Sequence, residues 1–309
     1  MRPFRFAVQL NGASTGPAWR GLARKLEDLG YATVFIPDHF GNQWAPLVAL
    51  TVAADATTTL RVGSLVFDND YRHPVELAKE VATLDLVSEG RVELGIGAGW
   101  MRSDYDELGL AYDRPGVRIE RMVEGLQIMK DLWADGTSTR SGSHYQVQGA
   151  RGLPRPFTAP HPPIIIGGGG RRILSIAARE ADIVGFNLLM ADGVGGPAAA
   201  ASAKAERFDE RVAWVREAAG ARFDSLELQV LTQAVAVVAD REAFFAETAP
   251  LFDMTASELA EVPVALAGTV EQIIETLLAR RERYGFSYWV VHEADIESFA
   301  PVVAALAGR

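Results

Sequence analysis

The 309-residue chain is 49% hydrophobic and 23% charged, a composition typical of a globular protein with a full apolar core. It contains no cysteine, which excludes disulfides, thiolate nucleophiles, cysteine-ligated zinc and iron–sulfur clusters. The formal net charge of -10 argues against general affinity for nucleic acid or acidic membrane surfaces, and it favours a small molecule as the binding partner.

The N-terminus leads directly into an alternating strand pattern, without the apolar stretch of a signal peptide. No apolar run in the chain is long enough to cross a membrane. We therefore expect a cytoplasmic protein. Its oligomeric state is left open, with a homodimer as the assembly considered.

Short apolar runs alternate with segments of helical periodicity along most of the chain. We predict strands over 4–10, 33–36, 60–67, 92–96, 163–166, 182–186, 226–238 and 287–292. We predict helices over 19–29, 46–56, 74–87, 117–133, from 171 onward, 198–219, 270–284 and 296–307. Continuous Val, Ile and Leu runs are typical of parallel strands covered by helices. Eight such units in about 300 residues fit a (β/α)8 barrel better than an open sheet.

The alternation is interrupted by a Gly-, Ser- and Pro-rich stretch over 135–163, which is typical of an inserted hairpin and loop. We therefore expect an α/β TIM barrel with insertions after strands 4 to 6. No boundary within the chain is evident, so 1–309 are predicted to form a single domain. The loops over 101–116, 135–163 and 188–197 are expected to build the substrate pocket.

Glycines alternate around the end of the fourth predicted strand, at Gly95, Gly97 and Gly99. Such a turn lets the backbone approach another molecule, and a helix start that follows it favours an anion. Trp100 stands where a dinucleotide-binding fingerprint has Gly or Ala, so we do not predict a Rossmann site. A ligand turn and a tight turn without a ligand both remain open for this stretch.

A second glycine turn, Gly167-Gly168-Gly169-Gly170, follows the fifth predicted strand and is followed by Arg171 and Arg172. A helix start with two adjacent guanidinium groups favours phosphate.

In a barrel, chemistry is expected at the C-terminal ends of the strands. One histidine there, His39, has a carboxylate neighbour, Asp38, and such a pair suits proton transfer. The other histidines show no metal-ligand spacing, so no metal is predicted. Asp104, Asp106 and Glu107 are most simply acids of a first helical turn. The predicted substrate pocket contains Asn11, Trp44, Trp100 and Asn187.

Five motifs in order carry a family resemblance. They are Ile36-Pro37-Asp38-His39-Phe40, Val62-Gly63-Ser64-Leu65-Val66, Tyr71-Arg72-His73-Pro74, Leu94-Gly95-Ile96-Gly97-Ala98-Gly99-Trp100 and Ile164-Ile165-Ile166-Gly167-Gly168-Gly169-Gly170. With them the chain resembles the bacterial luciferase-like superfamily, and most of all its branch that depends on the deazaflavin coenzyme F420. The similarity covers nearly the whole chain.

The resemblance implies a TIM barrel that holds FMN or F420 with its ring over the strand ends. Asp38 and His39 match the acidic residue and the histidine beside the ring, and Ser64-Leu65 match a bulged pair behind it, for which the resemblance implies a non-prolyl cis bond. The implied contacts to the cofactor tail and phosphate are Gly97, Ala98, Gly99, Gly167, Gly168, Gly169 and Gly170, with Arg171 and Arg172 next to them. Trp100 stands where sugar-phosphate dehydrogenases of this branch have a glutamate, which makes glucose 6-phosphate doubtful as a substrate.

The resulting hypothesis is an F420-dependent oxidoreductase that transfers a hydride between the deazaflavin C5 and a small organic substrate. Two alternatives stay open, an FMN-dependent monooxygenase on the same barrel and a cofactor-binding protein without turnover. Two arginines at the helix start suit the carboxylates of an F420 tail better than a single FMN phosphate, which favours F420.

Overall fold

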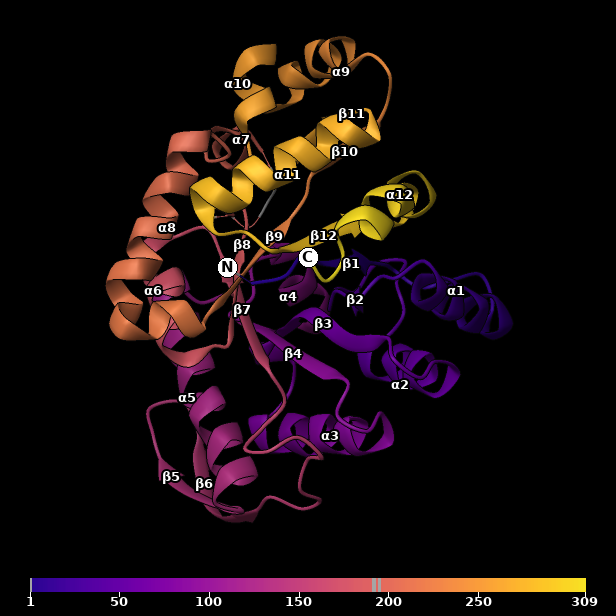
Figure 1. Cartoon of the computed structure of the whole chain (residues 1–309). Helices are drawn as coiled ribbons and strands as arrows, with labels where there is room; N and C mark the ends of the chain where they lie inside the picture. Colours follow the sequence, from indigo (N-terminus) through magenta and orange to yellow (C-terminus); the bar gives the residue numbers. More distant parts are fainter. Residues whose placement is uncertain (1, 191–192, 194–195) are drawn as a thin grey trace. The chain divides into compact units, whose positions relative to one another are not determined.

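The structure is a computed structural model that describes residues 2–190, 193 and 196–309. Eight parallel strands form a closed barrel in the order β1, β12, β9, β8, β7, β4, β3 and β2 (Figure 1). These strands are β1 (Arg5–Gln9), β2 (Thr33–Ile36), β3 (Arg61–Asp68), β4 (Val92–Gly97), β7 (Ile164–Gly168), β8 (Ile183–Phe186), β9 (Glu227–Leu231) and β12 (Tyr288–His292). The predicted (β/α)8 barrel is confirmed.

Helices follow the barrel strands. They are α1 (Gly16–Asp28), α2 (Pro46–Ala56), α3 (Pro74–Val87), α4 (Arg102–Leu108), α5 (Pro115–Ala134), α6 (Arg171–Glu180), α7 (Pro197–Ala201), α8 (Ala205–Ala219), α9 (Arg241–Thr248), α10 (Ala256–Glu261), α11 (Val270–Tyr284) and α12 (Ile296–Leu306). The short 3-10 turns are η1 (Asn69–Tyr71), η2 (Gly220–Ser225), η3 (Ala249–Phe252) and η4 (Glu293–Asp295). No described helix is long and apolar enough to cross a membrane.

Three helices, α2, α3 and α11, have the predicted bounds because local signals fix their ends. Pro46 and Pro74 occupy the first helical position, where the missing N–H has no intrahelical role. Thr269 and Gln272 form a capping box at the start of α11, and Gly285 ends that helix in the left-handed conformation.

The predicted seventh strand, over 226–238, is wrong, because the chain forms two strands there. After β9, the backbone N–H of Gln233 donates to Val264 O at 2.7 Å, which turns the chain away from the barrel. The following strand, β10 (Ala234–Val237), pairs in parallel with β11 (Ala265–Gly268) in a separate sheet. The predicted helix over 198–219 is likewise divided into α7 and α8, where Ser202 Oγ donates to Ala199 O at 2.7 Å.

The predicted hairpin is confirmed as β5 (Thr137–Ser141) and β6 (Gln146–Arg151), an antiparallel pair that packs beside α5 (Figure 1). The predicted insertions after strands 4 and 6 are present, after β4 and β8. The predicted insertion after strand 5 is wrong, because the chain passes from β7 directly into α6, and a further segment follows β9. Of the pocket loop predicted over 188–197, residues 191, 192, 194 and 195 lie outside the described residues.

The chain divides into two compact units, which we describe separately. Unit 1 comprises Met1–Leu10, Lys25–Val34 and Ile166–Arg309, and unit 2 comprises Asn11–Arg24 and Phe35–Ile165. The expectation of a single domain over 1–309 stays a prediction.

Each unit has an apolar core of its own. In unit 1, Phe286 packs against Phe186 and Trp289, with ring centroids at 5.0 and 6.1 Å. In unit 2, every residue of β4 is buried, and α3 packs against α5. Trp19 also lies in the core of unit 2, and its indole N–H donates to Ala49 O at 2.8 Å.

Candidate active site

Asp38, which follows β2 in unit 2, is buried and fully engaged by protein donors. Arg72 Nη2 donates to Asp38 Oδ1 at 3.0 Å, and Arg72 Nη1 donates to Oδ2. The backbone N–H of Asp68 also donates to Oδ2, at 3.2 Å. These hydrogen bonds hold the end of β2 next to the end of β3, so Asp38 helps to position the two strand ends. The catalytic role expected for Asp38 stays a prediction.

His39 lies against a buried carboxylate that is not its sequence neighbour. Its Nδ1 is 2.6 Å from Asp104 Oδ2 on α4, and the Tyr71 hydroxyl donates to the same oxygen at 3.1 Å. The His39 side chain is 26% exposed, whereas that of Asp104 is 4% exposed. Trp100 packs edge-on against the imidazole, with ring centroids 5.6 Å apart. The imidazole is therefore held on one side and accessible from solvent.

Asp104 was predicted only as an acid of a first helical turn, and it does lie in the first turn of α4, but its contact with His39 was not predicted. Asp106 and Glu107 of the same helix are exposed, whereas Asp104 and Tyr105 form its buried face. The available signal was the position of Asp104 beside an aromatic residue directly after the β4 glycine turn.

A network of acids and tyrosines surrounds the end of β3. Asp68 Oδ1 accepts from the backbone N–H of Asp70 at 2.9 Å and so caps η1, the turn that carries Tyr71. The Tyr105 hydroxyl and Arg121 Nη1 both donate to Asp70 Oδ2, at 2.9 and 2.7 Å. Burial raises the pKa of Asp68 to about 7, because little solvent stabilises its charge and Asp70 lies close by.

The predicted bulge in β3 is present, because the register with β4 shifts between Ser64 and Phe67. The buried hydroxyl of Ser64 donates to Ile36 O at 2.8 Å. The non-prolyl cis bond joins Leu65 to Val66, one residue after the Ser64-Leu65 link that the resemblance implied, so that prediction was wrong by one position.

The alternating glycines of β4 make room for this bulge and for the acid network. A Cβ on Gly95 would lie 2.0 Å from Ser64 O, and one on Gly97 would lie 2.6 Å from Val66 Cγ2. At Gly99, where φ is +72°, a Cβ would lie 2.0 Å from the Tyr105 hydroxyl. Contacts inside the chain thus account for these glycines. The cofactor contacts expected of Gly97, Ala98 and Gly99 stay predictions.

The second glycine turn belongs to unit 1, where Gly167–Gly170 lead into α6. Arg171 Nη2 donates to Glu217 Oε2 at 3.0 Å, and both side chains are exposed, at 63% and 69%. An exposed pair of this kind contributes at most about 1 kcal/mol, so it can exchange for another anion. Arg172 is exposed as well. Their roles, and those of Gly167–Gly170, stay predictions.

A buried arginine lies against the same turn, and sequence reasoning did not identify it. Arg211 of α8 is 2% exposed, and its Nε donates to Gly169 O at 3.0 Å. Its Nη1 has no hydrogen-bond partner among the described residues. Burial, and to a smaller extent the positive charge of neighbouring Arg207, lowers the pKa of Arg211 to about 10.

The remaining predicted pocket residues lie in different places. In unit 2, the backbone N–H of Trp44 donates to Asn11 O at 2.8 Å, and the Trp44 ring lies 5.8 Å from that of Trp19. Asn187, in unit 1, donates its backbone N–H to Gly168 O at 3.1 Å. The substrate contacts expected of Asn11, Trp44, Trp100 and Asn187 stay predictions.

Two of the other histidines, His73 and His292, have structural contacts. His73 accepts from the backbone N–H of Val75 at 3.3 Å and caps α3, and His292 Nε2 lies 2.9 Å from Thr232 O. Among the described residues, no group of three or more His, Asp or Glu side chains is arranged to hold a metal ion.

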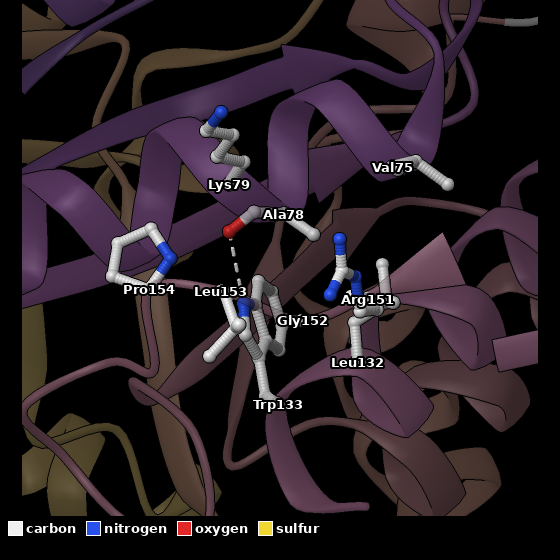
Figure 2. A pocket seen from close by; sticks show the side chains of 9 residues that line it. All are labelled: Val75, Ala78, Lys79, Leu132, Trp133, Arg151, Gly152, Leu153 and Pro154. Carbon is white, nitrogen blue, oxygen red and sulfur yellow. Dashed lines mark hydrogen bonds between the residues drawn. The ribbon is translucent and has the colours of Figure 1, made fainter. Parts of the chain in front are cut away.

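One small cavity of unit 2 is lined in part by the loop over 135–163, which was expected to help build the substrate pocket, but by none of the individual residues predicted for the site. Figure 2 shows it between α3, the end of α5 and the segment after β6. Its volume of about 10 Å³ leaves room for no more than one water molecule. Trp133 closes it by donating its indole N–H to Ala78 O at 3.0 Å. It is therefore too small for a substrate.

Fold and site together define a (β/α)8 barrel that carries a histidine–carboxylate pair at its strand ends. A sequence model of the luciferase-like monooxygenase family matches residues 2–263, and the chain belongs to this family.

Two curated relatives illustrate the range of the family. The chain is 31% identical over 189 residues to an F420-dependent glucose-6-phosphate dehydrogenase from Nakamurella multipartita, covering 58% of this chain and 55% of that protein. It is 35% identical over 131 residues to the pyrimidine monooxygenase RutA from Methylobacterium radiotolerans, covering 41% of this chain and 32% of that protein. The chain thus spans about half or less of the length of these two relatives.

Solved structures share the fold at low identity. The coenzyme F420-dependent tetrahydromethanopterin reductase of Methanopyrus kandleri superimposes with a TM-score of 0.76 and 18% identity, covering 98% of this chain and 97% of that chain. The long-chain alkane monooxygenase LadA superimposes with a TM-score of 0.78 and 15% identity, covering 99% and 91%. At such identities the likeness supports the barrel alone.

Proposed function

We propose that this protein is an oxidoreductase that uses coenzyme F420 to transfer a hydride to or from a small organic substrate. The observation that carries the proposal is the His39 imidazole, whose Nδ1 faces Asp104 at 2.6 Å while the side chain remains 26% exposed. Such a ring can exchange a proton with a substrate oxygen through its other nitrogen. The similarity to proteins named as F420-dependent dehydrogenases supports the choice of cofactor.

The glycine turn of unit 1 fits an anionic group. The buried Arg211 guanidinium lies against Gly169 with Nη1 unpartnered among the described residues, and α6 begins directly after the turn. A helix start and a buried cation both stabilise negative charge. We propose that Gly167–Gly170, with Arg171 and Arg172, bind the phosphate and carboxylates of the F420 tail.

The ring-side residues that we propose lie in unit 2, at the ends of β2, β3 and β4. When bound, F420 supplies a carbon centre that accepts or donates a hydride. His39 takes the hydroxyl proton when an alcohol is oxidised, and returns it to the oxygen when a carbonyl is reduced. Trp100 packs against the imidazole and limits its rotation.

Steady-state assays with oxidised and reduced F420 test this proposal. We expect a change in F420 absorbance with at least one compound in a panel of alcohols, aldehydes and ketones. His39→Gln should lower turnover by about 100-fold while binding F420 as the wild type does. Absence of F420 turnover across the panel would contradict the proposal.

The similarity to a pyrimidine monooxygenase favours a second candidate, an FMN-dependent monooxygenase. A flavin can activate oxygen, whereas carbon at position 5 limits F420 largely to hydride transfer. Oxygen uptake that depends on reduced FMN and on an organic substrate would support this candidate, and oxygen uptake with FMN should be absent if the first proposal holds.

A further inference from the structure

Asp104 is a deeply buried carboxylate in contact with His39. The proton transfer proposed for His39 does not by itself call for such a partner. Asp104 is 3% exposed, although it lies in the first turn of a short helix whose other acids are exposed. One of its oxygens, Oδ2, forms hydrogen bonds with both His39 Nδ1, at 2.6 Å, and the Tyr71 hydroxyl, at 3.1 Å. Burying a carboxylate costs free energy unless the carboxylate is hydrogen-bonded. Here His39 and Tyr71 supply the hydrogen bonds that make the burial of Asp104 possible.

We propose that Asp104 is the positioning residue of His39, and that Tyr71 moderates its effect through the second hydrogen bond. Asp104 keeps the hydrogen of the neutral imidazole on Nδ1 and leaves the Nε2 lone pair for the substrate. The inference rests on the proposed function only where it assigns proton transfer to His39.

The chemistry of the two groups determines this tautomer. A neutral imidazole has one N–H and one acceptor nitrogen, whereas a carboxylate only accepts. With Asp104 Oδ2 at 2.6 Å, Nδ1 is therefore the donor and Nε2 the acceptor. When Nε2 takes a proton, the negative charge of Asp104 lies next to the positive charge of the imidazolium.

Tyr71 is held so that its hydroxyl remains a donor to Asp104. Its ring packs between Phe40 and Tyr105, with centroids at 5.3 and 5.7 Å. Burial raises the pKa of Tyr71, and the nearby charge of Asp68 raises it further. The phenol therefore stays protonated. Because its hydrogen bond stabilises the charge of Asp104, the carboxylate attracts the imidazole proton less strongly than it would alone.

Several other charged or titratable groups lie around this pair. Asp38, directly before His39, is neutralised by Arg72. Asp68 lies near Tyr71 at the end of β3, and burial raises its pKa to about 7. The groups on the elements around the pair are therefore Asp104 and Tyr105 on α4, Asp70 and Tyr71 on η1, Asp68 on β3, and the ion-paired Asp38 and Arg72.

Nitrogen NMR of the uniformly labelled protein tests the inference without any cofactor. The chain has five histidines, so the His39→Gln spectrum identifies the His39 signals. In Asp104→Asn we expect the neutral His39 ring to lose its preference for the Nδ1-protonated tautomer, seen as a change in the Nδ1 and Nε2 chemical shifts. Asp106→Asn removes an exposed acid from the same helix and should leave these shifts unchanged.

Kinetics add a second readout. Asp104→Asn should lower kcat by about 100-fold or more, with KM within about 3-fold, because the His39 ring then no longer presents its acceptor nitrogen to the substrate. Tyr71→Phe keeps the ring packing and leaves Asp104 Oδ2 to His39 alone, so the NMR signal of the His39 Nδ1 proton should move to lower field as its hydrogen bond strengthens. This second variant keeps the inference testable if Asp104→Asn does not fold. An unchanged His39 tautomer in Asp104→Asn, or an unchanged Nδ1 proton shift in Tyr71→Phe, would overturn the inference.

The two readouts separate this inference from the proposed function. NMR shifts in the variants without F420 turnover in the wild type would contradict the proposed function and support the positioning role. Turnover in the wild type with unchanged His39 NMR signals in the variants would support the proposed function and contradict the positioning role.

Discussion

Both carboxylate oxygens of Asp38 accept hydrogen bonds from the guanidinium of Arg72, and the two side chains are 4% and 21% exposed. Removing Arg72 would leave a buried carboxylate without its counter-ion. Because such a loss is strongly destabilising, we expect Arg72→Met to lower the free energy of unfolding by about 3 kcal/mol in urea titrations.

Arg171→Met is the matched control, since it breaks an exposed pair with Glu217. It should cost less than about 1 kcal/mol. Equal effects of the two substitutions would show that the Asp38–Arg72 pair does not organise the ends of β2 and β3.

A comparison of substitutions at Gly99 and Gly109 distinguishes the cost of backbone strain from the cost of close packing. Both have positive φ, at +72° and +68°, but only a Cβ at position 99 would meet other atoms, the Tyr105 hydroxyl at 2.0 Å and Asp68 Oδ2 at 2.3 Å. We expect Gly109→Ala to cost about 1 kcal/mol and Gly99→Ala about 3 kcal/mol, measured by thermal unfolding. Similar costs for the two would mean that the acid network yields readily to a methyl group.

The raised pKa of Asp68 predicts a pH dependence of stability. The folded state keeps the Asp68 proton up to a pH of about 7, whereas the unfolded chain loses it near 3.8. The folded state therefore holds more protons in this window, and this contribution makes stability fall as pH rises from about 4 to about 8. Since one pKa unit corresponds to about 1.4 kcal/mol, the loss has an upper limit of about 4 kcal/mol.

Asp68→Asn removes this titration, so its free energy of unfolding should depend less on pH than that of the wild type. Asp106→Asn, at an exposed position, should keep the wild-type dependence. The same decline toward high pH in Asp68→Asn as in the wild type would show that another group causes it.

His39→Ala tests whether the exposed imidazole acts in turnover. We expect an intact fold by circular dichroism, unchanged cofactor affinity and a kcat lower by about 100-fold, as for loss of a proton-transfer group. His73→Ala, which removes the cap of α3, should reduce stability but not kcat. Unchanged turnover in His39→Ala would assign His39 to packing.

The sequence was sufficient for the barrel because its information is local. Short apolar runs that alternate with helical periodicity indicated the strands and helices, and Pro74 or Gly285 fixed helix ends. The seventh strand failed for a non-local reason, since β10 leaves the barrel to pair with β11, some 30 residues later in the chain.

The site was only partly predictable, for the same reason. His39 could be found from its place after β2, but its partner Asp104 lies 65 residues away, and only folding buries it. Gly97 and Gly99 suggested a ligand turn, whereas the structure gives them neighbours from β3 and α4. Arg211 carried no local signal, because its contact with Gly169 depends on how α8 packs against α6.

A competition titration of F420 against FMN tests the central claim most directly. It is made on the wild type, on Arg171→Ala/Arg172→Ala and on Arg179→Ala, which removes an exposed cation from the other end of α6. Each titration is repeated at two salt concentrations, because exposed charge interactions weaken with salt.

We expect the wild type to bind F420 more tightly than FMN. The double variant should weaken F420 binding more than FMN binding and reduce its salt dependence, and Arg179→Ala should match the wild type. Tight FMN binding without measurable affinity for F420 would contradict the F420 assignment and favour the monooxygenase.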